Sequence, residues 1–325
     1  MPRKSVLAFQ PLLPQGANLT ALAEDGITQL IVIAGQTASG KSDFAIQVAQ
    51  QLTKAGRPAE IVNADAMQLY RGMDIGTAKL PERDRGGITH HLIDVLEPTQ
   101  DCTVVRYREL ATPIIERLIQ RGVLPILTGG SMFYIAGLTD ELDFAPSDEA
   151  LRENLEQQLQ QLGSSGMHDR LSELDPTSAA KIPASNSRRV IRALEVIELT
   201  GSPYAATLPE PVSRWRTTFI GLQPNPELAK QRIANRAQQM LQSGLIAEAE
   251  ELAKRGLSRT AGKAIGYRQA LAMQRGEVSE AEAVREIIQL TERYAKRQRS
   301  WFRRDKRIHW LREPYDLAAA LQLIG

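Results

Sequence analysis

Short apolar runs alternate with helix-like patterns over the first 130 residues of the chain. Continuous apolar runs suit strands that are buried on both faces of a parallel sheet, whereas apolar residues three or four apart indicate helices with one buried side. The runs predict strands at 30–34, 60–65, 90–95 and 123–127, and the spacing predicts helices around 44–52 and 110–119. This order predicts an α/β fold with a wound parallel sheet flanked by helices.

The pattern changes near residue 140. From 140 to 214 no strand candidate occurs, leucines recur at helical spacing, and Asp175-Pro176 is typical of a helix start. Strand character returns at 217–222, and a mostly helical stretch follows until a short strand at 307–310. We therefore expect a flexible N-terminal arm (1–28), a catalytic core (29–139 and 215–325) and an all-helical insertion domain (140–214).

Composition narrows the class of protein. The 325 residues are 42% hydrophobic and 24% charged, with a formal net charge of +2, so that a sizeable core can form. No run of about 18 apolar residues occurs, which predicts no membrane association. The single cysteine, Cys102, excludes an internal disulfide and a multi-cysteine zinc site. We expect a monomer in the cytoplasm.

A phosphate-loop pattern follows the first predicted strand and precedes the first predicted helix. Its residues are Gly35, Gln36, Thr37, Ala38, Ser39, Gly40, Lys41 and Ser42. The glycines let backbone N–H groups converge on one anion at a helix N-terminus, Lys41 adds a charge, and Ser42 is placed to bind Mg²⁺. The pattern predicts a P-loop NTPase-like core. A chance glycine-rich turn is the alternative, and the loop alone equally fits a kinase or a nucleotide hydrolase.

The segments that follow carry a family resemblance. They are DAMQLYRGMDIGTAK (65–79), HHLID (90–94), PILTGGSMFY (125–134), RALEV (192–196), AIGY (264–267) and AKRQRSWF (295–302). With the phosphate loop, these segments resemble the tRNA dimethylallyltransferase (tRNA isopentenyltransferase) family, in order, from about Gln29 to Trp310. The chain departs from the family pattern where Gln36 replaces a proline, Ser42 and Ser131 replace threonines, Ala66 replaces a serine, and Ser185-Asn186 replaces Asn-Asp.

The resemblance implies transfer of a dimethylallyl group from dimethylallyl diphosphate to the exocyclic amine of the adenine at tRNA position 37. It makes Asp65 the general base and places Ser131 beside the flipped base. Arg232 and Arg236, four residues apart on one predicted helix, are candidates for contacting the reacting diphosphate; which of them reaches it stays open. The alternatives for Asp65 are an outer magnesium contact and a turn cap. A helix cap is the alternative for Ser131.

The distribution of charge indicates RNA. Between 293 and 307, eight residues are basic and one is acidic. A basic run is commonly only a solvated face, but two such clusters beside one crevice favour phosphate contacts. The expected tRNA-binding residues are Ala66, Met67, Gln68, Arg188, Arg189, Arg192, Gly262, Lys263, Ala264, Ile265, Gly266, Tyr267, Lys296, Arg297 and Arg299. Phe133 and Tyr134 are expected in the core, with a role as stacking platforms as the alternative.

Three rival functions remain at this point. A P-loop nucleoside or nucleotide kinase would share the phosphate loop but leaves the MDIGTAK and AKRQ segments unexplained. An enzyme that prenylates a free adenine nucleotide would not need so basic a C-terminal helix. A nucleotide-gated RNA-binding switch would keep the basic helix without needing Asp65.

Overall fold

The computed structural model describes residues 28–204 and 209–325. The predicted N-terminal arm therefore lies outside the described residues, except for Thr28.

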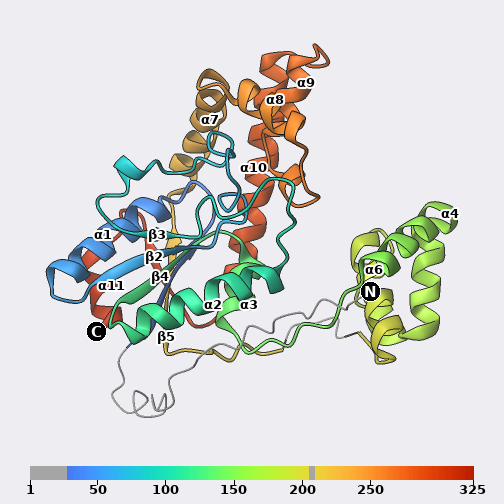
Figure 1. Ribbon diagram of the computed structural model, residues 1–325, viewed down its shortest axis with the longest axis horizontal. Helices are drawn as coiled ribbons and strands as arrows, with labels where there is room; N and C mark the ends of the chain where they lie inside the picture. The colour runs from blue at the N-terminus through green and yellow to red at the C-terminus, as the bar shows by residue number, and fades with distance from the viewer. Residues whose placement is uncertain (1–27, 205–208) are drawn as a thin grey trace, which may run out of the picture.

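A six-stranded, wholly parallel sheet forms the centre of the molecule (Figure 1). The strands are β1 (Leu30–Gly35), β2 (Ala59–Asn63), β3 (His90–His91), β4 (Leu124–Gly129), β5 (Thr217–Gln223) and β6 (Ile308–Arg312). Their order across the sheet is β3-β2-β4-β1-β5-β6. The wound α/β fold expected from the sequence is confirmed. Because the strands are parallel, their carboxyl ends lie at one edge of the sheet. The strand order reverses between β1 and β4, and ligands bind at the carboxyl ends beside such a reversal.

Two of the predicted strands are shorter than expected. The strand predicted at 90–95 keeps only His90 and His91, because Leu92 (φ 60°) and Asp94 (φ 56°) adopt left-handed backbone conformations that a strand excludes. The Asp94 carboxylate turns instead to the Lys79 ammonium, 2.5 Å away. β2 ends at Asn63 rather than at 65, which leaves Asp65 in the loop beyond the strand.

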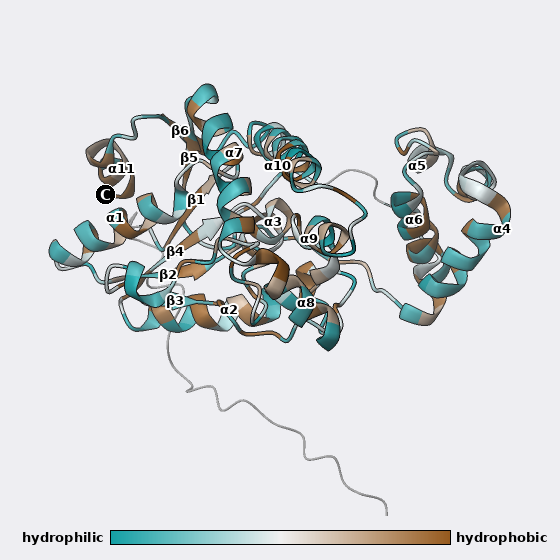
Figure 2. Cartoon of the chain, turned by 90° about the horizontal axis from the view of Figure 1, so that it is seen from above, coloured by the Kyte–Doolittle hydropathy of each residue, from teal (hydrophilic) through white to brown (hydrophobic). Residues whose placement is uncertain are grey.

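Helices cover both faces of the sheet, and the side chains of β1 alternate between them. Leu30, Val32 and Ala34 pack with α2 (Val104–Gln120) and α3 (Met132–Thr139). Ile31 and Ile33 pack with α1 (Lys41–Lys54) and α11 (Leu317–Ile324). Figure 2 shows the hydrophobic strands between helices that are hydrophilic on the outside. This burial on both faces explains the continuous apolar runs.

A group of helices extends the first face beyond the sheet edge (Figure 1). They are α7 (Pro226–Gln242), α8 (Leu245–Arg255), α9 (Tyr267–Gln274) and α10 (Glu280–Phe302), with a short 3₁₀ turn at Ala261–Lys263; another 3₁₀ turn, Glu82–Asp84, lies on the α1 side of the sheet. α10 begins with a capping box between Ser279 and Glu282 and packs against α7, α9 and β1. Among the described residues, no helix combines the length and apolar character needed to cross a bilayer.

The insertion consists of α4 (Glu149–Leu174), α5 (Pro176–Ala179) and α6 (Ser187–Thr200) around a core of its own. Figure 1 shows it set apart from the body on two connecting segments. Arg307 fastens both segments to the body, since its guanidinium donates to Asp140 at 2.7 Å and to the Ser213 hydroxyl at 2.8 Å. The insertion is thereby attached at its base, on the edge of the sheet domain.

Candidate functional site

The phosphate loop forms a cradle between β1 and α1. Ala38 (φ 62°) and Gly40 (φ 74°) are left-handed, which curls the backbone around a single point at the start of α1. The Ser39 hydroxyl is fully buried and has no hydrogen-bond partner among the described residues. Converging N–H groups, a helix N-terminus and an unpaired hydroxyl together form a site for an anion.

Two buried cations, Lys41 and Arg236, meet at this cradle, and the Asp65 carboxylate lies close enough to act on both. The Lys41 ammonium donates to the Gln36 carbonyl at 2.7 Å. Removal from water lowers the pKa of Lys41 to about 8; the nearby Asp65 carboxylate opposes this shift, and Arg236 adds to it. Burial likewise lowers the pKa of Arg236, whose Nε is buried and donates no hydrogen bond to a described residue. A bound diphosphate would satisfy both groups.

The structure separates the two arginines that the sequence left as equivalent candidates. Arg236 lies inside the cradle, within electrostatic reach of Lys41 and Asp65. Arg232, one helical turn earlier on α7, lies at the rim, where it pairs with Glu313 and approaches the Ala38 carbonyl at 3.5 Å. Its side chain is 43% exposed. Arg236 is thus the arginine positioned for a bound diphosphate, and a direct role for Arg232 in the reaction stays a prediction.

Asp65 stands at the carboxyl edge beside the cradle. Asn63, at the end of β2, accepts from the Asp65 N–H at 3.0 Å and donates to the Leu92 carbonyl at 2.9 Å, which fixes the loop. The Asp65 Oδ1 accepts from the Met67 N–H at 2.9 Å. The turn-capping role weighed from the sequence is therefore real. Its second oxygen, Oδ2, accepts no hydrogen bond from the described residues and remains available for a proton.

Ser131 joins the ends of β2 and β4. Its hydroxyl accepts from the Ala66 N–H at 2.8 Å, and its own N–H donates to the Ala64 carbonyl at 3.2 Å. Ser131 precedes α3, yet its side chain makes no capping bond to that helix. The hydroxyl also lies within hydrogen-bonding reach of the Tyr294 hydroxyl, so Ser131 belongs to a polar cluster beside Asp65.

Sequence reasoning missed two residues of α10 that organise this edge. Gln298, 1% exposed, accepts from the Thr37 N–H at 2.7 Å and donates to the Gly130 carbonyl at 2.8 Å, so it ties the phosphate loop to the end of β4. A side chain at Gly130 would collide with it, at 2.1 Å. Burial raises the pKa of Tyr294 to about 12, and the neighbouring Asp65 carboxylate adds to this rise. A polar residue on the buried side of a helix was the available signal for Gln298.

The MDIGTAK turn (73–79) is anchored on α8 and α9. The Glu248 carboxylate on α8 accepts from three successive N–H groups, of Asp74, Ile75 and Gly76, at 2.9–3.2 Å. Tyr267 donates to the same carboxylate at 2.7 Å. Tyr267 is 2% exposed, and its ring lies where a side chain at Gly76 would be. The Tyr267 side chain is therefore directed into the protein, and a tRNA contact by this residue stays a prediction.

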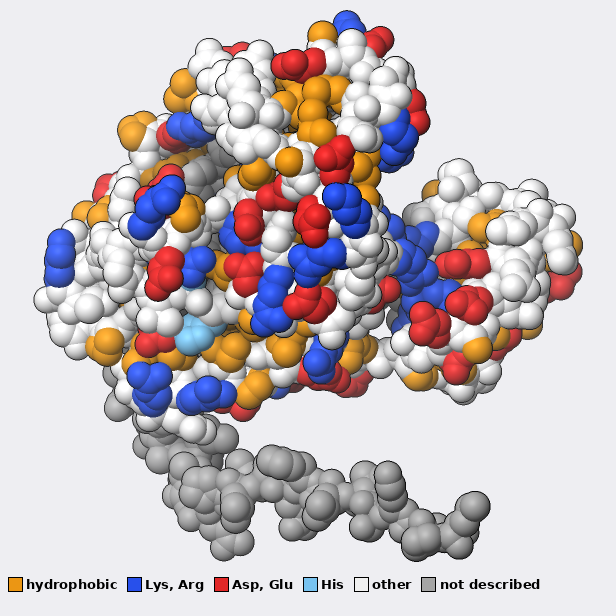
Figure 3. Space-filling view, turned by 45° about the horizontal axis from the view of Figure 1, so that its top comes forward, with side chains coloured by type: hydrophobic (Ala, Val, Ile, Leu, Met, Phe, Trp, Pro, Cys, Tyr) orange, Lys and Arg blue, Asp and Glu red, His pale blue; other side chains and the backbone are white. Residues whose placement is uncertain are grey.

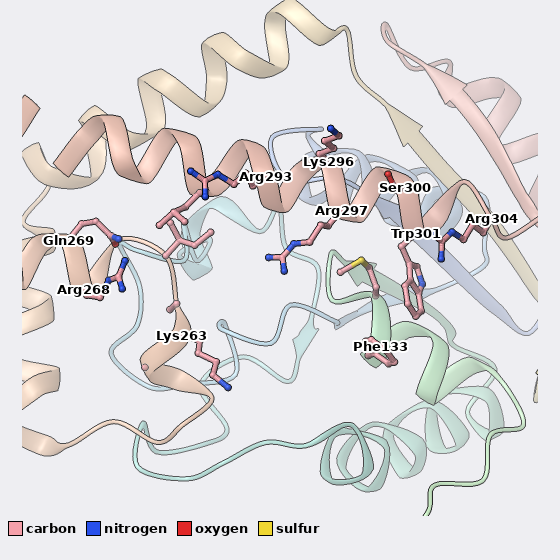
Figure 4. A pocket seen from close by; sticks show the side chains of 15 residues that line it. Phe133, Lys263, Arg268, Gln269, Arg293, Lys296, Arg297, Ser300, Trp301 and Arg304 are labelled. Atoms are coloured by element: carbon pink, nitrogen blue, oxygen red, sulfur yellow. The ribbon is translucent and has the colours of Figure 1, made fainter. Parts of the chain in front are cut away.

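A basic groove of about 1060 Å³ runs along the outer side of α10 (Figure 4). It brings together several predicted RNA-binding residues, namely Gly262, Lys263, Ala264, Ile265, Lys296 and Arg297. Arg299 is not among its lining residues, and Gly266 is buried behind it. Arg192 is held inside the insertion, where it donates to the Ala145 and Pro146 carbonyls and to Glu195.

The expectation for the Phe133-Tyr134 pair is half wrong. Tyr134 is in the core, where its ring stacks on Tyr107 with centroids 4.3 Å apart. Phe133 is 54% exposed and lines the basic groove. Neighbouring positions in the first turn of α3 point in different directions, so only one of the two can face the sheet.

The insertion faces the body across a second group of cations. Partial burial lowers the pKa of Lys263, and the nearby guanidinium groups of Arg188 and Arg259 lower it further. Arg188 belongs to α6 of the insertion, and an ion pair from Arg259 to Glu156 of α4 (3.1 Å) also joins the two parts. Figure 3 shows Lys and Arg side chains gathered where the insertion faces the body.

A family model described as IPP transferase matches residues 68–305. This chain belongs to the IPP transferase family. It is 49% identical over 293 residues to the tRNA dimethylallyltransferase of Thermobifida fusca, covering 89% of this chain and 91% of that protein. It is 47% identical over 297 residues to the tRNA dimethylallyltransferase of Kineococcus radiotolerans, covering 89% of this chain and 94% of that protein.

Two solved structures show the same fold as this IPP transferase family member. One is the tRNA isopentenylpyrophosphate transferase of Bacillus halodurans, with a TM-score of 0.64 and 36% identity over 91% of this chain and 93% of that one. The other is a eukaryotic dimethylallyltransferase acting on tRNA, with a TM-score of 0.71 and 26% identity over 91% of this chain and 77% of that one. The family resemblance inferred from the motifs is confirmed.

Proposed function

We propose that this IPP transferase family member transfers the dimethylallyl group of dimethylallyl diphosphate to the exocyclic amine of an adenine in the anticodon loop of tRNA. The relatives named as tRNA dimethylallyltransferases support this proposal. The observation that carries it is the position of the Asp65 carboxylate beside a cradle that holds two buried cations, Lys41 and Arg236.

The cradle binds the donor by its diphosphate. Loop N–H groups, Lys41 and Arg236 surround the leaving group, so that negative charge that develops on its oxygen as the carbon–oxygen bond breaks is stabilised. Mg²⁺, bound through the exposed Ser42 hydroxyl and diphosphate oxygens, would supply further positive charge there. No group of three or more His, Cys, Asp or Glu able to hold a metal occurs among the described residues, so most of its ligands would come from the diphosphate and water.

Asp65 serves the acceptor. The adenine amine is a weak nucleophile because its lone pair is delocalised into the ring. As its nitrogen forms the new bond to the allylic carbon, the carbon–oxygen bond breaks, diphosphate leaves, and the proton passes from the amine to Asp65. Such a general base contributes about 10²–10⁴-fold. Ser131 donates its hydroxyl hydrogen to the adenine and so orients the amine toward Asp65.

The rival functions account for less of the molecule. A small-molecule kinase or a prenyltransferase of free nucleotides would use the cradle but leave the basic groove and the insertion without a role. A stacked adenine cannot reach Asp65, so the RNA substrate must present its target base flipped out of the loop. The proposal includes a monomeric enzyme, since one chain supplies the residues named for the site. It also includes the cytoplasm as the location.

The decisive experiment incubates the protein with dimethylallyl diphosphate, Mg²⁺ and unmodified tRNA, and measures prenylated adenosine by mass spectrometry. We expect product with the wild type and a loss of about 10²-fold or more in kcat with Asp65→Asn, while diphosphate affinity is retained. Asp84→Asn, which changes an exposed carboxylate in the 3₁₀ turn Glu82–Asp84, serves as the control.

Near-full activity of Asp65→Asn would remove Asp65 as the base. A wild-type protein that turns over ATP but forms no prenylated adenosine would favour the kinase. RNA binding without either reaction would favour the nucleotide-gated switch.

A further inference from the structure

Two aromatic rings, those of Phe133 and Trp301, lie in contact in the lining of the basic groove. Phe133 is contributed by the first turn of α3, and Trp301 by the last turn of α10. Their ring centroids are 4.7 Å apart and their planes are inclined at 49° (Figure 4). Phe133 is 54% exposed, although large aromatic side chains are generally buried. The neighbouring Tyr134 shows that this turn can bury a ring, so Phe133 is directed outward by the packing of α3.

All the charged side chains that line the groove beside these rings are cationic. Six side chains of the groove lining are cationic and none is acidic: Lys263, Arg268, Arg293, Lys296, Arg297 and Arg304. Lys296 and Arg304 form no ion pair with any residue in the described part of the chain. A concave surface with this charge complements a polyanion. An apolar peptide would not require the cations, and a polyanion without bases would not require the aromatic rings.

We propose that Phe133 and Trp301 form a stacking platform for an unpaired base next to the adenine that reacts. Phosphates of a single strand match the cations, and the face of a base matches an aromatic ring, which is the usual combination for single-stranded nucleic acid. A paired stem offers no free base face, so the occupant is a loop nucleotide. This inference rests on the proposed function and extends it from the reacting base to its neighbour.

The position of the platform supports this assignment. Phe133 follows Ser131 by two residues, so the aromatic pair lies directly beyond the residue that is expected beside the reacting adenine. α10 separates the two spaces: Tyr294 and Gln298 face the cradle side, where they contact Gly130, whereas Arg297 and Trp301 line the groove. A strand that places one base beside Asp65 therefore carries its neighbouring nucleotides into the groove. Stacking a neighbour there also replaces part of the stacking energy that the flipped base loses.

The test combines Phe133→Leu with a set of anticodon stem–loop RNAs, each lacking the base at one unpaired position other than the target. Leu keeps an apolar side chain but removes the ring face, and because the site is exposed the fold should tolerate it. We expect the KM for RNA to rise about tenfold in Phe133→Leu, with the KM for dimethylallyl diphosphate and the salt dependence unchanged. Phe133→Trp should restore the wild-type KM, since it retains a stacking ring.

For one abasic RNA, the KM with the wild type should rise by about the same factor, and Phe133→Leu should cause no further rise with that RNA. This RNA identifies the base that stacks on Phe133. The platform is refuted if Phe133→Leu leaves the KM for RNA unchanged. It is also refuted if, for every abasic RNA, the rise in KM caused by Phe133→Leu multiplies with the rise caused by the missing base, because then no missing base contacts Phe133. The same cycle measured as binding of a labelled stem–loop by fluorescence anisotropy does not need turnover. A wild type that binds but forms no product would therefore count against the proposed function and leave the platform to be decided by the binding cycle.

Discussion

Lys41 illustrates how one side chain acquires its properties from the cradle. Its ammonium group is removed from water beside Arg236, and only Asp65 partly compensates, so its pKa falls to about 8. A protonated amine in this setting lacks a full counter-charge. A bound diphosphate provides that charge and must therefore raise the pKa of Lys41. Binding of the donor and protonation of Lys41 are linked.

This linkage predicts that donor affinity depends on pH. The diphosphate prefers the ammonium form, which predominates below pH 8 in the free protein. Affinity should change little below about pH 7 and then fall as pH rises through 8, by up to about tenfold per pH unit well above the pKa. Calorimetric titration with dimethylallyl diphosphate from pH 7 to 9.5 measures this. Lys41→Arg should remove the fall because arginine stays protonated. A wild-type affinity that is constant up to pH 9.5 would contradict the prediction.

α10 shows how one helix serves three parts of the site. Its buried side carries Gln298, which ties the phosphate loop to β4. The adjoining side carries Tyr294 toward Asp65, and the next carries Arg297 and Trp301 into the groove. Because residues of a helix turn by 100° from one to the next, the short segment YAKRQRSW (294–301) reaches all three directions.

The MDIGTAK turn depends in the same way on a neighbouring helix. Glu248 of α8 satisfies three N–H groups of the turn and the Tyr267 hydroxyl. Lys79, whose side chain is 5% exposed, holds the other end of the turn through Asp74 and Asp94. Glycine is required at Gly76 because the Tyr267 ring fills the space of a side chain.

Glu248→Ala should therefore lower the free energy of unfolding by about 3 kcal/mol, since it leaves several partly buried donors without a charged acceptor. Glu251→Ala on the same helix removes an exposed carboxylate 3.8 Å from Lys254 and should change it by less than about 0.5 kcal/mol. Urea denaturation of both variants measures the difference. Equal effects from the two substitutions would show that the turn does not depend on Glu248.

At the scale of the whole molecule, the body and the insertion present cations to each other. Lys263 of the body lies close enough to Arg188 of the insertion for the guanidinium to lower the pKa of the lysine. Like charges held together in this way repel each other, and an RNA phosphate between them removes the repulsion. The insertion would then contact the RNA stem from the side opposite the groove.

Lys263→Ala and Arg188→Ala should each weaken tRNA binding and each reduce the slope of log affinity against log salt by about one, while the affinity for dimethylallyl diphosphate is unchanged. Filter binding at a series of salt concentrations measures the slope. Lys230→Ala, an exposed lysine of α7 that pairs with Glu227, is the matched control. If the two variants keep the wild-type slope, the cations between body and insertion do not contact phosphates.

The sequence by itself determined the parts of this protein that depend on local patterns. Apolar runs buried on both faces fixed the parallel strands, the glycines fixed the phosphate loop directly after β1, and leucine spacing fixed the helical character of the insertion. Asp65 and Ser131 could also be placed, because carboxyl ends of adjacent parallel strands meet at one edge. The motifs were sufficient to indicate the family.

Tertiary structure decided which of several equivalent side chains face the site. Arg232 and Arg236 lie on the same side of α7 by spacing, and only the packing of that helix against the cradle buries the second. Packing between other elements turns Tyr267 inward onto Glu248, turns Phe133 outward into the groove, and brings Gln298 from a distant helix to the phosphate loop. Helical periodicity specifies which residues share a side, but contacts between elements distant in sequence determine what that side meets.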